Sequence, residues 1–343
     1  MKKIFTLVLI FLLLFSIILS FTSCLGIFYD FNYTLSEDGT YYIVSRIGTL
    51  PDDVGLDFTI SVTIPEVYNN LPVASIGDFA LGRVPSLRSV KIPDSVTTIG
   101  NYAFTGCENL KSIEIPDSVT SIGHCAFQDC KNLKNIEIPD SVTSIGGKAF
   151  YGCEKLEYSE YNNASYLGNE ENPYFALIES RNGYFADMHE DTRIIANGAF
   201  WLGEYFESVT IPDSITHIDV DVFSGFHKLT SIAVDENNTA YKSIDGNLYS
   251  KDGKTLVKYA IGKTATSFTI PDSVTTIGSS AFRGCDSLTS VYYKGTAAEW
   301  SEISIGSQND EFTSATRYYY SETEPAGEGN YWHYDSDGNI ALW

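Results

Sequence analysis

The sequence predicts a solenoid, in which short repeats stack and each repeat buries its apolar side against its neighbours. The first observation is three tandem segments of 23 residues, which begin at Leu87, Leu110 and Leu133. They read LRSVKIPDSVTTIGNYAFTGCEN, LKSIEIPDSVTSIGHCAFQDCKN and LKNIEIPDSVTSIGGKAFYGCEK. The second is that the same pattern returns after interruptions, from Phe206 and again from Phe268. A repeat this short cannot form its own core, so the pattern favours one continuous stack over separate globular domains.

The amino terminus is typical of an export signal. Lys2 and Lys3 precede an apolar run, and the segment ends in LSFTSC. This ending resembles a bacterial lipoprotein signal, with Phe21 where leucine is usual, and it predicts a signal peptide over 1–23 and lipidation of Cys24. A plain signal peptide or an uncleaved anchor helix is the alternative, since about 20 apolar residues can span a bilayer. Each interpretation exports the rest of the chain, either lipid-anchored or secreted.

Residues 24–57 are predicted to cap the start of the stack, because the alternation in YYIVSRIG favours strands and Asp38-Gly39 favours a hairpin turn. The solenoid is predicted over 58–295, and its first repeat is degenerate. Insertions at about 157–191 and 234–264 interrupt it. Such insertions map to one edge of a solenoid, which is often the edge that binds partners.

Residues 296–343 differ in composition, being rich in Tyr and Trp. We expect them to form an aromatic C-terminal cap that ends in a hairpin, with its turn at Asp337-Gly338.

A single repeat shows why the coil folds. Alternation in Ser112-Ile113-Glu114-Ile115 predicts a short strand with both isoleucines inward, and Pro116, which has no N–H, ends it. A second short extended segment follows, and Gly123 is expected to supply a permissive backbone at the corner. Ala126-Phe127 are predicted to lie in a short helical or 3₁₀ turn with the phenyl ring inside the coil. The expected fold is therefore mainly β and irregular, with short parallel strands, capped at both ends.

Four cysteines occupy the same place in the repeat, three residues after the phenylalanine: Cys107, Cys130, Cys153 and Cys285. Disulfides or a metal site are two interpretations. The favoured one is a ladder of buried thiols, because cysteine is a small residue that is often buried. A thiol spacing of 23 residues is a repeat spacing and does not match a zinc motif. No metal site is predicted.

The pattern LxxIxIPxSVxxIGxxAFxxCxxL, from Leu110 to Leu133, resembles the BspA-like leucine-rich repeats of bacterial surface proteins. The resemblance covers residues 58–295, and the insertion YKSIDGNLYSKDGKTLVKY is similar to an element common in these proteins. It implies a solenoid of leucine-rich-type repeats, a place in the cell envelope, and attachment to host matrix proteins, host cells or other bacteria. No compact ligand motif accompanies it, so the fold does not name the partner.

No catalytic constellation is recognisable, and neither catalytic residues nor cofactors are predicted. The five histidines lack metal-type spacing: His124, His189, His217, His227 and His333. GxSxG, Walker and dinucleotide motifs are missing from the sequence. DSDGN, from Asp335, is like the start of a calcium loop, but a hairpin turn explains it better.

The formal net charge of −22 disfavours nucleic acid as a partner, since phosphate binding requires a basic surface. Part of this charge is the repeated aspartate of IPDS, at Asp94, Asp117, Asp140, Asp213 and Asp272. These residues are expected to cap local backbone N–H groups in turns, and a weak line of divalent-ion sites is the alternative.

Candidate binding residues are aromatic, because binding hot spots favour Trp and Tyr. They concentrate in the first insertion and the C-terminal cap: Tyr158, Tyr161, Tyr166, Trp300 and Trp332. The alternative is that most of these rings pack a cap whose core is otherwise thin.

The leading hypothesis is a non-catalytic, exported adhesion protein of the cell surface. It would be tethered to the membrane by the lipid on Cys24 and would bind proteins or glycans on host or neighbouring cells. The alternative is a structural component of the envelope that self-associates or binds neighbouring envelope proteins. Concentration-dependent assembly separates the two hypotheses.

Overall fold

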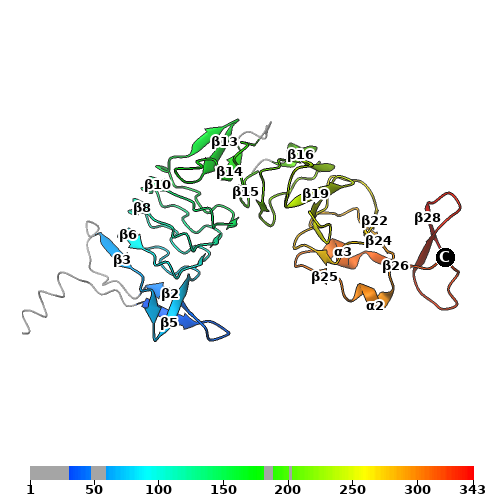
Figure 1. The fold of residues 1–343 in the computed structure, drawn as a ribbon, viewed down its shortest axis with the longest axis horizontal. Coiled ribbons are helices and arrows are strands. Elements are labelled where there is room, and N and C mark those ends of the chain that lie inside the picture. Colours follow the sequence, from blue (N-terminus) through cyan, green and yellow to red (C-terminus); the bar gives the residue numbers. More distant parts are fainter. Residues whose placement is uncertain (1–30, 48–58, 181–187, 201–202) are drawn as a thin grey trace, which may run out of the picture.

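The computed structural model describes residues 31–47, 59–180, 188–200 and 203–343. The predicted signal peptide, Cys24 and much of the predicted N-terminal cap lie outside the described residues. The coils stack into an arch whose two arms meet near β15 (Ile194–Ile195) and β16 (Ser208–Ile211) (Figure 1). In the described part of the chain, no helix is long and apolar enough to cross a membrane.

Two lines of short strands run along the arch. The first line consists of the strand that opens each repeat. Its members are β3 (Ile60–Thr63), β6 (Leu87–Lys91), β8 (Ser112–Ile113), β10 (Asn135–Ile136), β16 (Ser208–Ile211), β18 (Ser231–Val234), β22 (Ser267–Thr269), β24 (Ser290–Tyr293) and β26 (Thr316–Tyr320). We call it the opening line.

The second line consists of the strand that ends at the corner of each repeat, and we call it the corner line. Its members are β5 (Leu71–Ile76), β7 (Thr98–Ile99), β9 (Ser121–Ile122), β11 (Ser144–Ile145), β14 (Ala176–Ser180), β15 (Ile194–Ile195), β17 (His217–Ile218), β21 (Thr255–Lys258), β23 (Thr276–Ile277) and β25 (Ser304–Ile305). Hydrogen bonding breaks it into three sheets, which contain β5 to β11, β14 to β17 and β21 to β25.

The remaining elements flank or interrupt the stack. At the N-terminal end are β1 (Phe31–Leu35), β2 (Tyr42–Ile47) and β4 (Val67–Tyr68). The interruptions carry β12 (Ser159–Tyr161), β13 (Ala164–Leu167), η1 (Gly203–Tyr205), β19 (Tyr241–Ile244) and β20 (Asn247–Ser250). The C-terminal end holds α2 (Ala297–Trp300), α3 (Asp310–Ser314), β27 (Tyr331–Tyr334) and β28 (Ile340–Leu342).

The 23-residue period fixes the strand register. Neighbouring strands are parallel, with Ser112 opposite Asn135 and Ser121 opposite Ser144. Ile113 is buried and Ser112 is exposed, as the alternation predicts. A tight turn begins at Phe127, where the amide N–H of Cys130 donates to the carbonyl of Phe127 at 3.2 Å. The solenoid class predicted from the repeat is confirmed.

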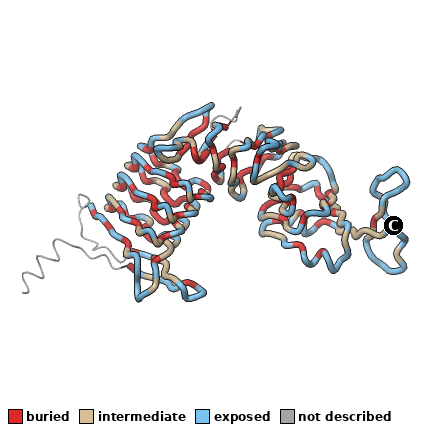
Figure 2. The backbone as a smooth tube through the Cα atoms, viewed as in Figure 1, coloured by how far each residue is buried: buried red, intermediate tan, exposed pale blue. Residues whose placement is uncertain are grey.

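The core consists of stacked side chains inside the coils, and Figure 2 shows the buried residues lining both arms. Phe104, Phe127 and Phe150 form one column, with ring centroids 5.1 and 5.6 Å apart and planes within 3° of parallel. The buried residues form two clusters, one in each arm. Each coil therefore depends on its neighbours for burial, as in other repeat proteins.

Glycine at the corner is required for a different reason from the one expected. Gly123 has no left-handed backbone; the left-handed residue is Cys125, with φ of 53°. Instead, a Cβ at Gly123 would lie 2.5 Å from the carbonyl carbon of Gly100 in the preceding coil. A Cβ at Gly146 would likewise lie 2.6 Å from the carbonyl carbon of Gly123. The corner glycine allows backbone to pack directly on backbone.

We expect Gly146→Ala to lower the free energy of unfolding by about 1–3 kcal/mol, the usual cost of overpacking. The adjacent Gly147 is the matched control, because a Cβ there meets only side-chain atoms, at 3.4 Å or more. Gly147→Ala should leave stability unchanged or raise it by about 0.4–1 kcal/mol. Urea unfolding of both variants measures the difference. Equal stabilities would show that backbone contact does not constrain the corner.

One charged side chain is buried in the C-terminal arm. Lys258 is only 5% exposed, and its Nζ donates to the carbonyl of Ser280 at 2.7 Å. Burial lowers the pKa of the Lys258 ammonium to about 8, because desolvation penalises its charged form. The protein therefore keeps a costly buried amine at the end of β21.

This lysine predicts a rise in stability with pH. The folded protein releases the Lys258 proton near pH 8, whereas an unperturbed lysine releases it at 10.5. Between these values the folded state binds fewer protons, so the free energy of unfolding rises with pH, by up to about 3 kcal/mol. Urea unfolding of wild type and Lys258→Met at several pH values isolates the effect, because other groups titrate in both. A constant difference between the two proteins would contradict the prediction.

Candidate functional site: an acidic groove beside the first interruption

An open groove of about 1060 Å³ lies over the opening line in the N-terminal arm. Its floor consists of the outward residues of β8 and β10, chiefly Ser112 and Asn135. The alternation of side chains along each strand determines this floor, because the next residues along the strands, Ile113 and Ile136, are buried in the core. Six acidic residues line the groove: Glu114, Asp117, Glu137, Asp140, Glu170 and Glu171. No lysine or arginine is among the described residues that line it.

One wall of the groove is the loop between β13 and β14. The carbonyl of Gly168 accepts from the amide N–H of Ile138 at 2.9 Å, so the loop continues the ladder beyond β10. The amide of Asn169 donates to the carboxylate of Asp140 at 2.8 Å and to the carbonyl of Ile138 at 3.2 Å. This attachment places Glu170 and Glu171 at the end of the row begun by Glu114 and Glu137.

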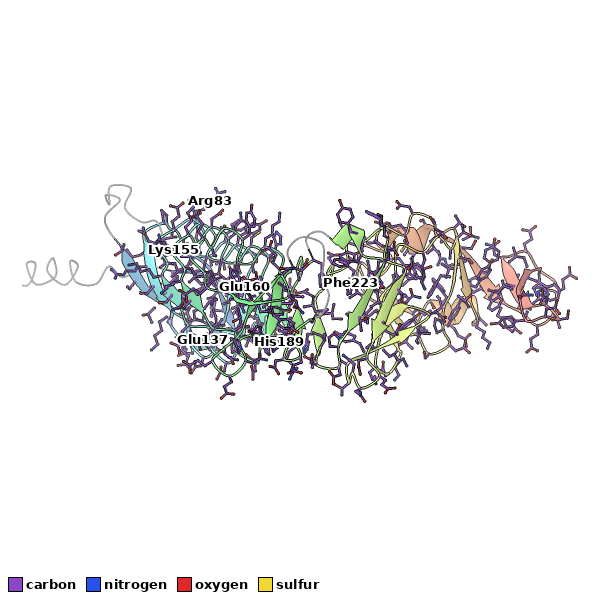
Figure 3. The ribbon with its side chains drawn as sticks, turned by 90° about the horizontal axis from the view of Figure 1, so that it is seen from above. Arg83, Glu137, Lys155, Glu160, His189 and Phe223 are labelled. Atoms are coloured by element: carbon purple, nitrogen blue, oxygen red, sulfur yellow. The ribbon has the colours of Figure 1, made fainter. Side chains whose placement is uncertain are left out.

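Two acidic residues elsewhere in the same coils are paired with lysines. Glu108 pairs with Lys131 at 2.8 Å, and Glu157 pairs with Lys134 at 3.2 Å. Within the described residues, Glu114 and Glu137 of the groove form no ion pair. In Figure 3, Glu137 lies at the edge of the N-terminal arm opposite Arg83. The groove therefore keeps a negative electrostatic potential. Elsewhere on the arm, lysines offset the charge of acidic residues.

Three of the aromatic candidates are buried. Tyr166 and Trp332 are 0% exposed, and Trp300 is 7% exposed. The indole N–H of Trp332 donates to the carbonyl of Tyr293 at 2.9 Å, and the guanidinium of Arg317 lies over the Trp300 ring. These rings pack the protein, so they offer no anchor at the surface of this structure.

The other two candidates remain accessible. Tyr161 is exposed and lies edge-on to the ring of His189 at 4.9 Å, while Tyr158 is half-buried. His189 also stacks on Tyr174, with ring centroids 3.8 Å apart. The first interruption thus gathers an aromatic cluster of Tyr161, Tyr174 and His189, and a role for it in binding stays a prediction.

The repeated aspartates do not form a metal site among the described residues, where no cluster of three or more His, Cys, Asp or Glu side chains could hold an ion. All five aspartates are exposed. The turn they occupy is closed by the backbone, with Val119 N–H donating to the carbonyl of Pro116 at 3.0 Å. The adjacent serine makes a polar contact with the preceding coil, because Ser118 Oγ donates to the carbonyl of Val96 at 2.6 Å. Two of the aspartates accept from other segments, Asp140 from Asn169 and Asp272 from Lys294.

The calcium-like segment at Asp335 is a hairpin turn. The Asp335 carboxylate accepts from the amide N–H groups of Asp337 and Asn339 at 2.9 and 2.8 Å. This turn joins the antiparallel strands β27 and β28. The carboxylate therefore stabilises the hairpin turn that Asp337-Gly338 predicts.

The cysteines of the repeat are buried free thiols. Cys130 Sγ donates to the carbonyl of Phe104, and Cys153 Sγ to that of Phe127, at 3.2 and 3.1 Å. Burial raises the pKa of Cys107 and of Cys285 to about 12. The thiols of Cys107, Cys130 and Cys153 donate hydrogen bonds between coils, and the buried free thiols match the ladder favoured by the sequence.

We expect the five cysteines that follow Cys24 to be unreactive in the native protein at pH 8. Thiolate is the reactive form, and burial both blocks access and suppresses ionisation. Colorimetric thiol titration should find no fast-reacting group among them under native conditions. In urea without reductant, all five should react. A lower count in urea would reveal a disulfide and contradict the thiol ladder.

The groove is a candidate functional surface that sequence analysis missed. The outward strand residues Ser112 and Asn135 are polar and form the floor. What makes a groove is the loop at Gly168 to Glu171, whose position depends on contacts between distant segments. The acidic pair in GNEEN, following outward Glu114 and Glu137, was the one available signal.

Comparison with known proteins gives a family match. The family described as BspA type leucine-rich repeat region matches in six copies, over residues 61–171, 192–261 and 258–307. These ranges cover most of the chain. No curated protein sequence matches it.

Two solved structures illustrate what the chain is similar to. A leucine-rich cell surface protein from Faecalibacterium prausnitzii A2-165 shares 28% identity, over 85% of this chain and 75% of its own, with a TM-score of 0.37. A leucine-rich repeat protein from Bacteroides ovatus shares 25% identity, over 84% of this chain and 70% of its own, also with a TM-score of 0.37.

Proposed function

Because the chain belongs to the family of BspA-type leucine-rich repeat proteins, we propose that it is a non-catalytic binding protein of the bacterial cell surface. The repeats supply a scaffold, and the acidic groove supplies the binding surface. The export signal and lipidation of Cys24 would tether the scaffold outside the cell. Its partners would be proteins or glycans on host or neighbouring cells.

The observation that carries the proposal is the groove itself. Its volume of about 1060 Å³ is just above the usual range for ligand sites, about 300–1,000 Å³. Its floor is built from outward positions that the core does not constrain, and its wall comes from an interruption of the repeat. Solenoids commonly use such extended surfaces for binding. The unpaired carboxylates favour partners that present basic groups.

The test is binding of the exported chain to arrayed matrix proteins, mucins and glycans at low and high salt. Glu114→Gln/Glu137→Gln should weaken a groove-dependent interaction about tenfold and reduce its salt dependence, since rim charges govern electrostatic steering. The matched control is Asp286→Asn/Glu302→Gln, which makes the same charge change at exposed positions in the other arm. Equal losses in both variants would indicate a general charge effect and would contradict a groove site.

One observation favours the alternative, a self-associating envelope component. The last strand, β28, lies at the edge of its sheet, and Ile340 and Leu342 on it are 39% and 52% exposed. An exposed apolar edge is a template for pairing with another chain. Light scattering that rises with protein concentration, together with a blank array, would support this alternative.

A further inference from the structure

The corner line follows one hydrogen-bonding rule in the regular coils. The amide N–H of the corner glycine donates to the carbonyl of the isoleucine in the preceding coil. Gly123 donates to Ile99 at 2.8 Å, and Gly146 donates to Ile122 at 2.8 Å. The rule stops at β11, because the next strand of the corner line, β14, belongs to a different sheet. A strand that ends a sheet presents unpaired backbone groups, which are a liability.

The free edge of β11 is closed by a side chain from the other side of the break. One oxygen of the Asp219 carboxylate, Oδ2, accepts from the amide N–H of Ile145 at 3.1 Å and from Ser144 Oγ at 2.8 Å. Asn197 N–H completes the closure by donating to the carbonyl of Ile145 at 3.0 Å. The carboxylate thus takes the place of the carbonyl that the next strand would present.

Asp219 stands where the regular coils carry the corner glycine. The alignment of HIDVDVF with SIGHCAF puts Asp219 opposite Gly123. The same alignment of IIANGAF puts Ala196 at the glycine position of the coil that precedes the coil of Asp219. From β14 to β21 this glycine is replaced throughout, because the strand register puts Ile178, Ala196, Asp219 and Val257 at its place. Of these four residues only Asp219 carries a carboxylate. The departure from the repeat therefore coincides with a specific contact between segments 74 residues apart.

The second break in the corner line is also closed by a side chain, but by a tyrosine hydroxyl instead of a carboxylate. Here β17 ends its sheet, and the amide N–H of Ile218 donates to the hydroxyl of Tyr241 at 3.0 Å. Tyr241 comes from β19, in the second interruption. Both breaks are thus closed by a side-chain oxygen that accepts from the equivalent isoleucine N–H. This recurrence distinguishes the Asp219 contact from an incidental surface hydrogen bond.

We propose that Asp219 is a clasp that closes the edge of β11 and fixes how the two arms of the arch are joined. The bonds it accepts are assisted by its charge, which makes them stronger than neutral ones. Its other oxygen, Oδ1, accepts from the amide N–H of Val220 at 2.7 Å, which fixes the side chain in place. Asp219 is therefore a positioning residue for the whole scaffold.

Two measurements on Asp219→Ala test the clasp without any ligand. Hydrogen exchange should show the Ile145 amide exchanging at least tenfold faster than in wild type, because its acceptor is gone. Spin labels on Lys111→Cys and Asp286→Cys, one exposed position in each arm, should report a broader or shifted distance distribution. The matched control is Asp213→Ala, an exposed aspartate in the same coil, which should change neither quantity.

A second variant keeps the proposal testable if Asp219→Ala does not fold. Ser144→Ala removes one of the two bonds to Oδ2 and leaves the other, so the Ile145 amide should exchange faster by a smaller factor. Unchanged exchange at Ile145 and an unchanged distance distribution in the folded variants would overturn the proposal.

Discussion

The close approach of successive coils at the corner glycine is the constraint on which the rest of the structure depends. Parallel strands lie about 4.8 Å apart, and at Gly100, Gly123 and Gly146 this spacing brings backbone onto backbone. The same spacing places the phenylalanine rings in a stacked column and each thiol within reach of a carbonyl in the preceding coil. One distance therefore organises the core, the polar contacts between coils and the outward rows of side chains.

Where the hydrogen bonding of the corner line is interrupted, the structure departs from a regular stack of repeats. After β11 the regular repeat is interrupted, and β10 and β11 each end a sheet. Later segments of the chain supply hydrogen-bond partners for the backbone groups at both of these edges. The edge of the opening line is satisfied by the loop at Gly168, and that of the corner line by Asp219. The first of these attachments creates the wall of the groove. The interruption thus produces the candidate site because the backbone groups of the regular coils need partners there.

Much of the fold is readable from the sequence, because a period of 23 residues determines register and alternation determines which residues point inward. The breaks are harder to read, since their structure depends on pairs such as Asp219 and Ile145 that are far apart in the chain. The aromatic candidates show the same limit. An aromatic residue signals a large apolar area, but Trp332 is covered because it lies opposite Tyr320 and against Tyr293, a distant pairing that no local pattern reveals.

The groove also shows how a repeat fold separates stability from recognition. Inward positions are committed to the core, so outward residues can change at little cost to the stack. Glu114 and Glu137 directly follow the paired strands β8 and β10, and two like charges at about the spacing of neighbouring strands cost on the order of 1 kcal/mol in water. The protein offsets charge elsewhere with Lys131 and Lys134, yet leaves these two carboxylates unpaired within the described chain. Stability alone does not account for that choice, whereas the proposed partner with basic groups would.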